Sequence, residues 1–208
     1  MRLFDCCPGD PALPARAELR RQKLIEAART LFAEHGFHGT GIAQIAAASG
    51  IKVGQIYRDF PSKEAIVGAI VEGDLIAFLD EDSLAAAIAA GDRPSIQRWI
   101  AHLVCGKDEH DRLVPEICAE AARNDRIAAI MDRINARVRC ELAAALRVFA
   151  PEPDKAAAVA TAVDLIMTLT IGVANQRNVW PDRDLNPLCA RIEALIEAEL
   201  AALAGSGR

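Results

Sequence analysis

The sequence predicts an all-α protein, and three observations support that prediction. Hydrophobic residues make up 52% of the 208-residue chain, and aromatic residues only 4%. The abundant Ala and Leu favour helices, and β-branched residues rarely alternate with polar ones as they do in strands. Apolar residues recur instead at i, i+3 and i+4, which is the spacing of one helix face. We expect nine to ten helices, arranged as an N-terminal three-helix head and a C-terminal helical domain.

Residues 40–64, TGIAQIAAASGIKVGQIYRDFPSKE, predict a helix-turn-helix. Ile42 and Ile45 share one face of a first short helix, Gly50 lies in the turn, and Ile56 marks the inner face of a second short helix. Two short helices that cross at a sharp angle through a turn containing Gly place the second helix in the DNA major groove. We interpret this stretch as a DNA-binding element.

The head should cover residues 15–61, after a disordered arm over residues 1–14 in which three prolines block helix formation. A first helix is expected from about Ala15 to His35, with Gly36 ending it. Its first turns carry basic side chains that either form a solvated face or reach DNA phosphates or the minor groove. These residues are Arg16, Arg20, Arg21 and Lys23.

Residues 62–204 should form the C-terminal domain. Ser62 is placed to cap its first helix, and Asp125 begins a long amphipathic one. The helix over about 156–175 is apolar on more than one face, which indicates burial on several sides. Asn186-Pro187 marks the start of the last helix.

Charge is unevenly spread along the chain, whose net charge is −5. Residues 1–63 hold nine Lys and Arg against six Asp and Glu, while the remainder holds 15 against 23. A mildly basic head on an acidic body suits a compact DNA contact.

No apolar run approaches the ~18 residues of a membrane span. The first residues lack the apolar core of a secretion signal, so we expect a cytoplasmic protein.

Metal and catalytic signatures are missing from the sequence. The six cysteines show no CxxC pair or metal-finger spacing, so most should be core residues or free thiols. The vicinal Cys6-Cys7 pair is either a redox or metal feature or part of a plain tail. His102 and Cys105, at i and i+3, make a poor metal site on their own, and we expect no cofactor. Without a Ser/His/Asp elbow, phosphate loop or HExxH motif, we expect no enzyme.

Many head residues fall in register with a known pattern: Leu31-Phe32-Ala33-Glu34-His35-Gly36-Phe37, Thr40, Ile45-Ala46, Gly50-Ile51, Gly54, Ile56-Tyr57, Phe60 and Ser62-Lys63-Glu64. Over roughly residues 16–70 this pattern resembles the DNA-binding head of the TetR/AcrR family of transcriptional regulators. The resemblance implies a homodimer in which each third helix enters a major groove. It also implies a ligand pocket in the body that changes the spacing of the two heads.

The resemblance also implies roles for individual residues. Thr40, at the start of the second helix, should touch a phosphate, and residues Lys52 to Arg58 should form the reading helix. Tyr57 and Lys63 should each contact a further phosphate. Asp59 stands where the family usually has His or Tyr, and we expect it to face away from the DNA backbone or to pair with a basic neighbour.

The reading helix suggests base contacts through its own chemistry. Gln55 is the best candidate, because its amide can bond adenine N6 and N7 together. Val53 would pack on a thymine methyl group, and Lys52 would reach a phosphate or a guanine edge. Arg58 completes the predicted DNA-binding set. Gly54 either lets the helix approach the sugar-phosphate backbone or serves packing.

A ligand pocket in the C-terminal domain should combine aromatic, soft and sparse polar groups on inward-facing helix positions. The candidate ligand-binding residues are Phe78, Trp99, His102, Cys118, Met131, Met167 and Thr170. Each is equally a residue type found in ordinary cores.

The sequence thus predicts a ligand-responsive transcriptional regulator, a repressor released from operator DNA by a small apolar effector. The alternative is an architectural or ligand-independent DNA-binding regulator without an effector pocket. Such a protein would share the head, but it would be more basic and would not need so large an apolar helical body.

Overall fold

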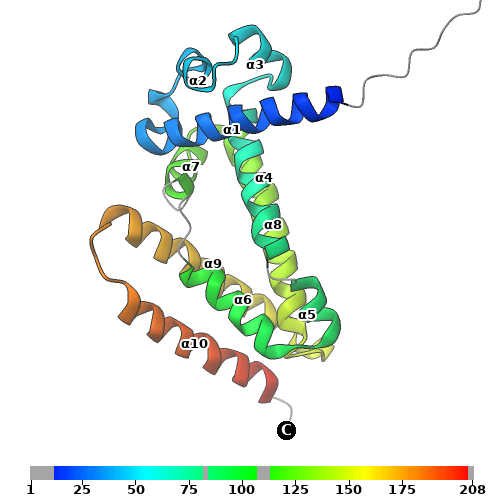
Figure 1. The fold of residues 1–208 in the computed structure, drawn as a ribbon. Coiled ribbons are helices and arrows are strands. Elements are labelled where there is room, and N and C mark those ends of the chain that lie inside the picture. Colours follow the sequence, from blue (N-terminus) through cyan, green and yellow to red (C-terminus); the bar gives the residue numbers. More distant parts are fainter. Residues whose placement is uncertain (1–11, 82–83, 107–112, 206–208) are drawn as a thin grey trace, which may run out of the picture. The chain divides into compact units, whose positions relative to one another are not determined.

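The computed structural model describes residues 12–81, 84–106 and 113–205, which fold entirely into helices and their connections (Figure 1). These residues form ten α-helices and one 3₁₀ turn, which confirms the predicted fold class. The elements are α1 (Ala12–Gly39), α2 (Ile42–Ser49), α3 (Val53–Asp59), α4 (Lys63–Glu81), α5 (Leu84–Ala90), α6 (Arg93–Cys105), α7 (Leu113–Ala121), α8 (Asp125–Arg147), η1 (Pro153–Lys155), α9 (Ala156–Val179) and α10 (Asn186–Gly205). Most of the expected arm over residues 1–14, including Cys6 and Cys7, lies outside the described residues.

Two compact units divide the chain, Met1–Ile70 and Val71–Arg208. The division falls inside α4, whereas the sequence suggested a boundary at residue 61. Ser62 caps α4 as expected, since its hydroxyl accepts a hydrogen bond from Ala65 N at 3.3 Å. The first turns of α4 are grouped with the head, and they carry the fully buried Ile66 and Ile70.

The head is organised around α1, against which α2 packs. Leu24, Ala28 and Phe32 lie on one stripe of α1 and are at most 1% exposed, so the predicted apolar face is its buried face. Gly36 interrupts the helix with φ 72°, a left-handed conformation that favours glycine, and one further turn follows before α1 ends. The expected stop at Gly36 is therefore a kink.

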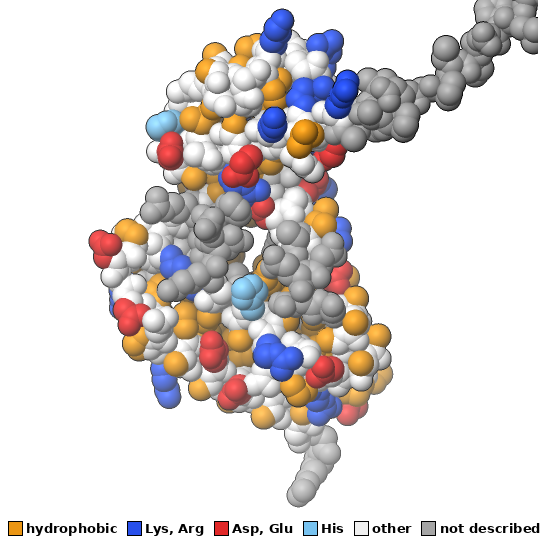
Figure 2. All heavy atoms as spheres, in the orientation of Figure 1, with side chains coloured by type: hydrophobic (Ala, Val, Ile, Leu, Met, Phe, Trp, Pro, Cys, Tyr) orange, Lys and Arg blue, Asp and Glu red, His pale blue; other side chains and the backbone are white. Residues whose placement is uncertain are grey.

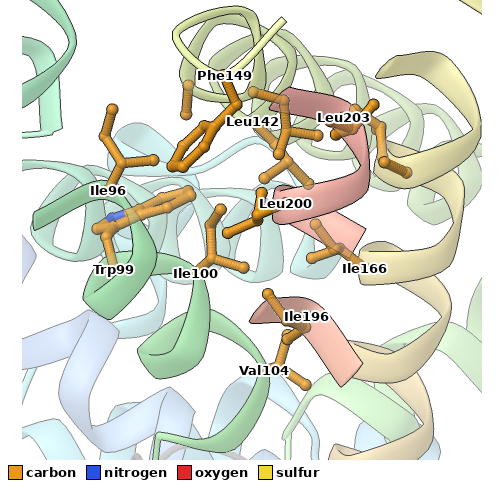
Figure 3. Close-up of a cluster of buried hydrophobic side chains, with 14 of the residues drawn as sticks. Ile96, Trp99, Ile100, Val104, Leu142, Phe149, Ile166, Ile196, Leu200 and Leu203 are labelled. Carbon is orange, nitrogen blue, oxygen red and sulfur yellow. The ribbon is translucent and has the colours of Figure 1, made fainter. Parts of the chain in front are cut away.

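The second unit has a core formed by α5, α6, α8, α9 and α10 (Figure 3). Trp99 of α6 is 1% exposed and lies beside Ile96 and Phe149 in this core. Leu142 of α8 and Leu200 of α10 are buried in the same cluster. Because side chains from all five helices interdigitate, they form one continuous apolar cluster.

One stretch, Pro153–Val179, is long and apolar enough to span a membrane by length and composition, contrary to the expectation that no run comes close. In the structure it packs against α6, α7, α8 and α10 and supplies Val163 and Ile166 to the core. We therefore assign α9 as a core helix. Only 28% of its most apolar stretch is buried within the chain, which leaves an apolar face open.

Cys105 lies at the end of α6, where its thiol donates a long hydrogen bond of 4.0 Å to the Cys189 carbonyl. Burial, helped by a hydrogen bond with the Cys189 side chain, raises the pKa of the Cys105 thiol to about 12. Because the thiolate is the reactive form, we expect iodoacetamide at pH 8 to alkylate the exposed Cys140 well before Cys105. Mass spectrometry of timed digests would measure both rates, and equal rates would contradict the burial of this thiol.

Candidate nucleic-acid interface

The turn between α2 and α3 is formed by a glycine and by hydrogen bonds between neighbouring residues. Gly50 adopts φ 70°, a left-handed conformation that glycine takes without steric cost. The Ser49 hydroxyl donates to Ile45 O at 2.7 Å and accepts from Ile51 N at 3.3 Å, which holds the chain as it leaves α2. At the other end of α2, Gly41 N donates to Gln44 Oε1 at 2.6 Å, which stabilises the helix start. The predicted helix-turn-helix is therefore present.

The third helix presents one face to the head core and another to solvent. Ile56 is fully buried, and Phe60 just beyond the helix is 3% exposed. On the outer side Val53 is 41% exposed and Tyr57 54% exposed, one turn apart. Exposed large side chains at i and i+4 form a continuous surface that the head core does not use.

Basic side chains surround this outer face. Lys52, at the N-cap of α3, and Arg58, in its last turn, are both exposed. In Figure 2, Lys and Arg side chains gather on the part of the head that carries α3. The combination of exposed α3 side chains with positive charge is suited to a DNA groove and its phosphates.

Gly54 lies on the same outer face, and the structure separates its two suggested roles. A Cβ built on Gly54 would meet no atom within 4 Å, so packing within the head does not require glycine here. The surface over this turn of α3 is open. This favours the interpretation that Gly54 allows close approach of a DNA backbone.

Two of the expected phosphate contacts need correction. Thr40 is fully buried, and its hydroxyl donates to Leu31 O at 3.0 Å. Its side chain therefore joins α1 to the start of α2 and does not face solvent. Lys63 Nζ donates to Phe37 O at 2.5 Å and to Thr40 O at 3.0 Å, and it lies 4.0 Å from the Phe37 ring centroid. Lys63 thus stabilises the end of α1, and these contacts direct its ammonium group into the protein.

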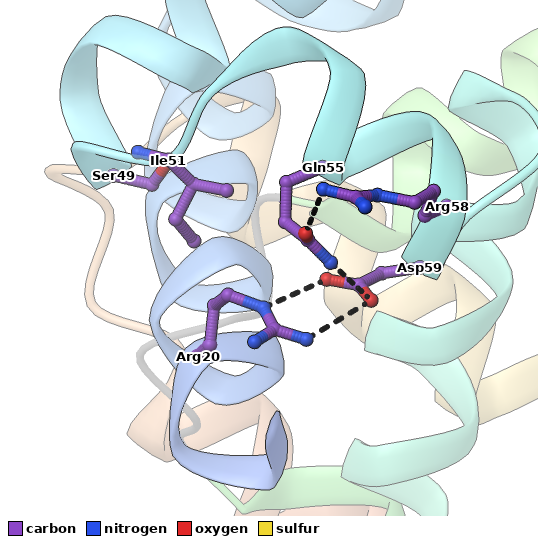
Figure 4. A network of polar contacts seen from close by, with 6 residues as sticks. All are labelled: Arg20, Ser49, Ile51, Gln55, Arg58 and Asp59. Atoms are coloured by element: carbon purple, nitrogen blue, oxygen red, sulfur yellow. Dashed lines mark hydrogen bonds and ion pairs between the residues drawn. The ribbon is translucent and has the colours of Figure 1, made fainter. Parts of the chain in front are cut away.

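Gln55, the expected base reader, is held in a polar network (Figure 4). Its Nε2 donates to Asp59 Oδ1 at 3.1 Å, and its Oε1 accepts from Arg58 Nη2 at 2.5 Å. Arg20 of α1 donates to both Asp59 oxygens, at 3.1 and 3.3 Å. Asp59 therefore pairs with a basic neighbour, as expected. The Arg20 hydrogen bond is the main reason that the pKa of Asp59 lies below its usual range.

Two of the basic side chains near the start of α1 contact the end of α3. Besides the Arg20 pair, the Arg21 guanidinium lies 4.3 Å from the Phe60 ring centroid. Both contacts hold α1 against the C-terminal end of α3. The Arg20–Asp59 pair is the part of this candidate site that periodicity did not single out. The signal for it was the unusual carboxylate at position 59.

The predicted ligand residues come together only in part. Phe78 of α4 lies 5.2 Å from Trp99 and 5.7 Å from His102, ring centroid to centroid, and it stacks on the imidazole at an interplanar angle of 8°. Met167 packs against the core, and the Thr170 hydroxyl donates to Ile166 O at 2.9 Å. Cys118 of α7 and Met131 of α8 are half-buried. A surface hollow of about 490 Å³ is lined instead by residues 179–183, between α9 and α10.

Trp99 has one unusual feature. Its Nε1 is buried and has no hydrogen-bond partner in the described part of the chain. Buried polar atoms are nearly always paired, so such an atom needs a specific explanation.

As for metals, no group of three or more His, Cys, Asp or Glu side chains among the described residues could hold an ion.

Comparison with known proteins identifies the head. The sequence pattern described as bacterial regulatory proteins, tetR family, matches residues 24–70, which include α2, α3 and most of α1. The head is of the TetR family. Members of this family are transcriptional regulators that bind operator DNA, and the family is not enzymatic, as the sequence predicted.

Curated TetR-family relatives match to different extents. The transcriptional repressor KstR2 of Rhodococcus jostii is 45% identical over 62 residues, which span 30% of this chain and 28% of that repressor. The transcriptional regulator UidR of Escherichia coli is 27% identical over 174 residues, 77% of this chain and 83% of UidR. The more identical match, to KstR2, is thus about the length of the head alone, whereas the longer match, to UidR, has a lower identity.

Solved structures share the whole architecture. GusR of Salmonella enterica matches with a TM-score of 0.63 at 24% identity, over 93% of this chain and 98% of GusR. A putative transcriptional regulator from Pseudomonas aeruginosa matches with a TM-score of 0.71 at 20% identity, over 91% of this chain and 92% of that protein. At these identities the likeness shows the fold, including the helical C-terminal domain.

Proposed function

We propose that this TetR-family regulator is a cytoplasmic repressor that binds operator DNA as a homodimer and is released by a small apolar effector. The observation that supports it best is the outer face of α3, where Val53, Tyr57 and Arg58 are exposed on a helix whose other face is buried. A head of this kind presents its second helix-turn-helix helix to the major groove. The relative KstR2 is a transcriptional repressor, which supports repression as the direction of control.

Homodimer formation is supported by the unburied apolar surface of α9 and α10. Ile171 of α9 is 52% exposed, and Leu188 and Leu195 of α10 are 40% and 42% exposed. Exposed large apolar side chains on two long helices that pack together favour an interaction site. A second copy of the same chain would cover this surface by an isologous contact that forms a four-helix bundle. Two joined heads would then bind two half-sites about 34–36 Å apart.

Effector binding is supported by the group of Phe78, Trp99 and His102. The Phe78 ring contacts both of the other rings, and the buried Trp99 Nε1 is a donor that an acceptor atom of a ligand would satisfy. Binding near α4 would act on the helix that runs from the head unit into the second unit. An effector that binds more tightly to the conformation with misplaced heads would lower DNA affinity by population shift.

The alternative function is ligand-independent regulation, and one observation favours it. Trp99 is 1% exposed and packed in the core, so a ligand would have to open that core to reach Nε1. A thermal-shift screen of small apolar compounds separates the two functions. Compounds that raise the melting temperature and lower operator affinity support the effector. Compounds that do neither, across a broad apolar library, favour the alternative.

The experiment that tests DNA binding uses the DNA upstream of the protein's own gene, titrated against salt by fluorescence anisotropy. We expect a clear preference over random duplex and a steep salt slope. Tyr57→Phe should weaken binding to operator and random DNA alike, because a phosphate contact carries no sequence information. Arg126→Ala, an exposed change on α8, is the control and should have no effect. No preference for that DNA or for any duplex selected from a random pool would overturn the proposal.

Gly54→Ala should separate folding from function. Alanine in a helix is more stable than glycine by about 0.5–1 kcal/mol, and the added methyl group meets no protein atom. We therefore expect a higher melting temperature together with weaker operator binding, because the methyl group projects where the DNA backbone approaches. Gly73→Ala on α4 is the matched control, since its Cβ also meets nothing within 4 Å. It should raise stability and leave DNA affinity unchanged.

A further inference from the structure

The head contains a chain of four side chains that crosses from α1 to α3 and ends at the outer face (Figure 4). Arg20 binds Asp59 through two hydrogen bonds, Asp59 accepts from Gln55 one helical turn earlier, and Gln55 accepts from Arg58. Arg20 and Asp59 are 39 residues apart in the sequence. The Asp59 side chain is 16% exposed, so this pair is partly shielded from water.

Asp59 determines how the Gln55 amide is oriented. An ionised carboxylate only accepts hydrogen bonds, and a guanidinium only donates them. Between Asp59 and Arg58, the Gln55 amide therefore has a single arrangement in which both contacts form, with Nε2 toward Asp59 and Oε1 toward Arg58. Reading adenine would need both the oxygen and the nitrogen of that amide at the base edge. The network engages one N–H and one lone pair of that amide, so Gln55 is less free to turn toward a base edge than its chemistry alone suggested.

The hydrogen bond to Gln55 orients the Arg58 guanidinium. One amino group of its guanidinium is held by Gln55 Oε1, which restricts the flexible side chain on the exposed surface of α3. Five N–H donors belong to a guanidinium, so most of them remain for a partner. Arg58 lies one turn beyond Gly54, where the surface is open. A prepositioned guanidinium beside this open stretch of the helix surface matches the O6 and N7 acceptors of guanine in a DNA major groove.

We propose that Arg58 reads a guanine in each operator half-site and that Asp59, fixed by Arg20, is a positioning residue that acts on Arg58 through Gln55. This inference rests on the proposed function, because it requires α3 to enter the major groove. It identifies the base, guanine, and the two residues, Arg20 and Asp59, that set the preference without touching DNA. The same guanidinium could instead bind a phosphate, and the test below distinguishes the two.

The test is selection of binding sites from a randomised duplex pool, followed by anisotropy on the selected operator and on single base-pair changes. For the wild type we expect one G·C pair per half-site whose replacement weakens binding about 10- to 100-fold, as for a bidentate Arg contact. Arg58→Ala should abolish that discrimination and leave the other positions unchanged. A uniform loss on every duplex would show a phosphate contact and overturn the proposal.

The positioning role is tested by Asp59→Asn, which keeps the size of the side chain and removes the charge that holds Arg20. We expect discrimination at the same G·C pair to fall, and no further loss when Asp59→Asn is added to Arg58→Ala. A merely structural role would lower affinity at all positions and would add to the Arg58 effect. Unchanged guanine discrimination in Asp59→Asn would overturn this part. Arg20→Lys, which keeps the charge, should retain more discrimination than Arg20→Ala.

Two controls distinguish a failure of the proposed function from a failure of the Arg58 inference. Arg147→Ala removes one exposed positive charge from α8 and should change neither affinity nor preference. Circular dichroism melting of each variant shows whether the head is folded. If the wild type selects no sequence at all, DNA reading by α3 fails. If it selects a sequence and Arg58→Ala leaves that preference intact, only the present inference fails.

Discussion

Replacing Trp99 by alanine should lower the free energy of unfolding by about 3–5 kcal/mol, the range for truncating a large buried aromatic side chain. Trp99 is 1% exposed and lies in the core cluster of the second unit, in contact with the Phe78 ring. Removing the indole leaves a cavity that the surrounding helices cannot fully close. Because domains are stable by only about 5–15 kcal/mol, this loss is a large fraction of the total. Urea denaturation followed by circular dichroism measures it.

The matched control is Trp180→Ala, because Trp180 is 51% exposed and the residue type is the same. A surface change of this kind should alter stability by no more than about 0.5 kcal/mol. The chain has two tryptophans, so each variant retains one of them. Fluorescence then identifies the emission of the buried and the exposed indole separately. A loss of no more than about 0.5 kcal/mol in the Trp99→Ala variant as well would show that the core does not depend on Trp99.

The head could be predicted from sequence because its elements follow local rules. The i, i+3, i+4 spacing that singled out Ile45 and Ile56 also describes which side of each short helix is buried. Gly36 and Gly50 lie where the chain takes positive φ, and Ser62 accepts the capping hydrogen bond. Each of these features depends on residues within one or two turns. Periodicity and turn chemistry therefore sufficed.

Side-chain roles at the interface were harder to predict, because they depend on contacts between helices. Thr40 was expected at a phosphate, yet its hydroxyl bonds the Leu31 carbonyl of α1. Lys63 was expected at another, yet it binds two carbonyl oxygens at the end of α1. The Arg20–Asp59 pair joins residues far apart in the chain. Helical spacing determines which face a residue occupies, but it contains no information about which polar partner the folded chain brings to that face.

Charge on the open face of α9 should separate the two subunits that we propose. Ile171→Glu adds a carboxylate where the side chain is 52% exposed, so the isolated chain tolerates it. In a dimer the same position would be covered by the partner, and burying an unpaired carboxylate costs several kcal/mol. We expect sedimentation velocity to show a dimer for the wild type and a monomer for the variant. Operator affinity should then fall by about 100-fold or more, because the second head no longer binds as part of one molecule.

Ile76→Glu on α4 provides the control, since Ile76 is 49% exposed and lies outside α9 and α10. It introduces the same charge at a similar exposure, so it should leave both the dimer and operator affinity unchanged. A monomeric wild type that still binds operator tightly would contradict the proposed dimer. A dimeric Ile171→Glu variant would place the interface elsewhere. If Ile171→Glu is monomeric but binds a single half-site as well as the wild type does, each head is intact. The lost operator affinity then belongs to the link between heads and not to α3.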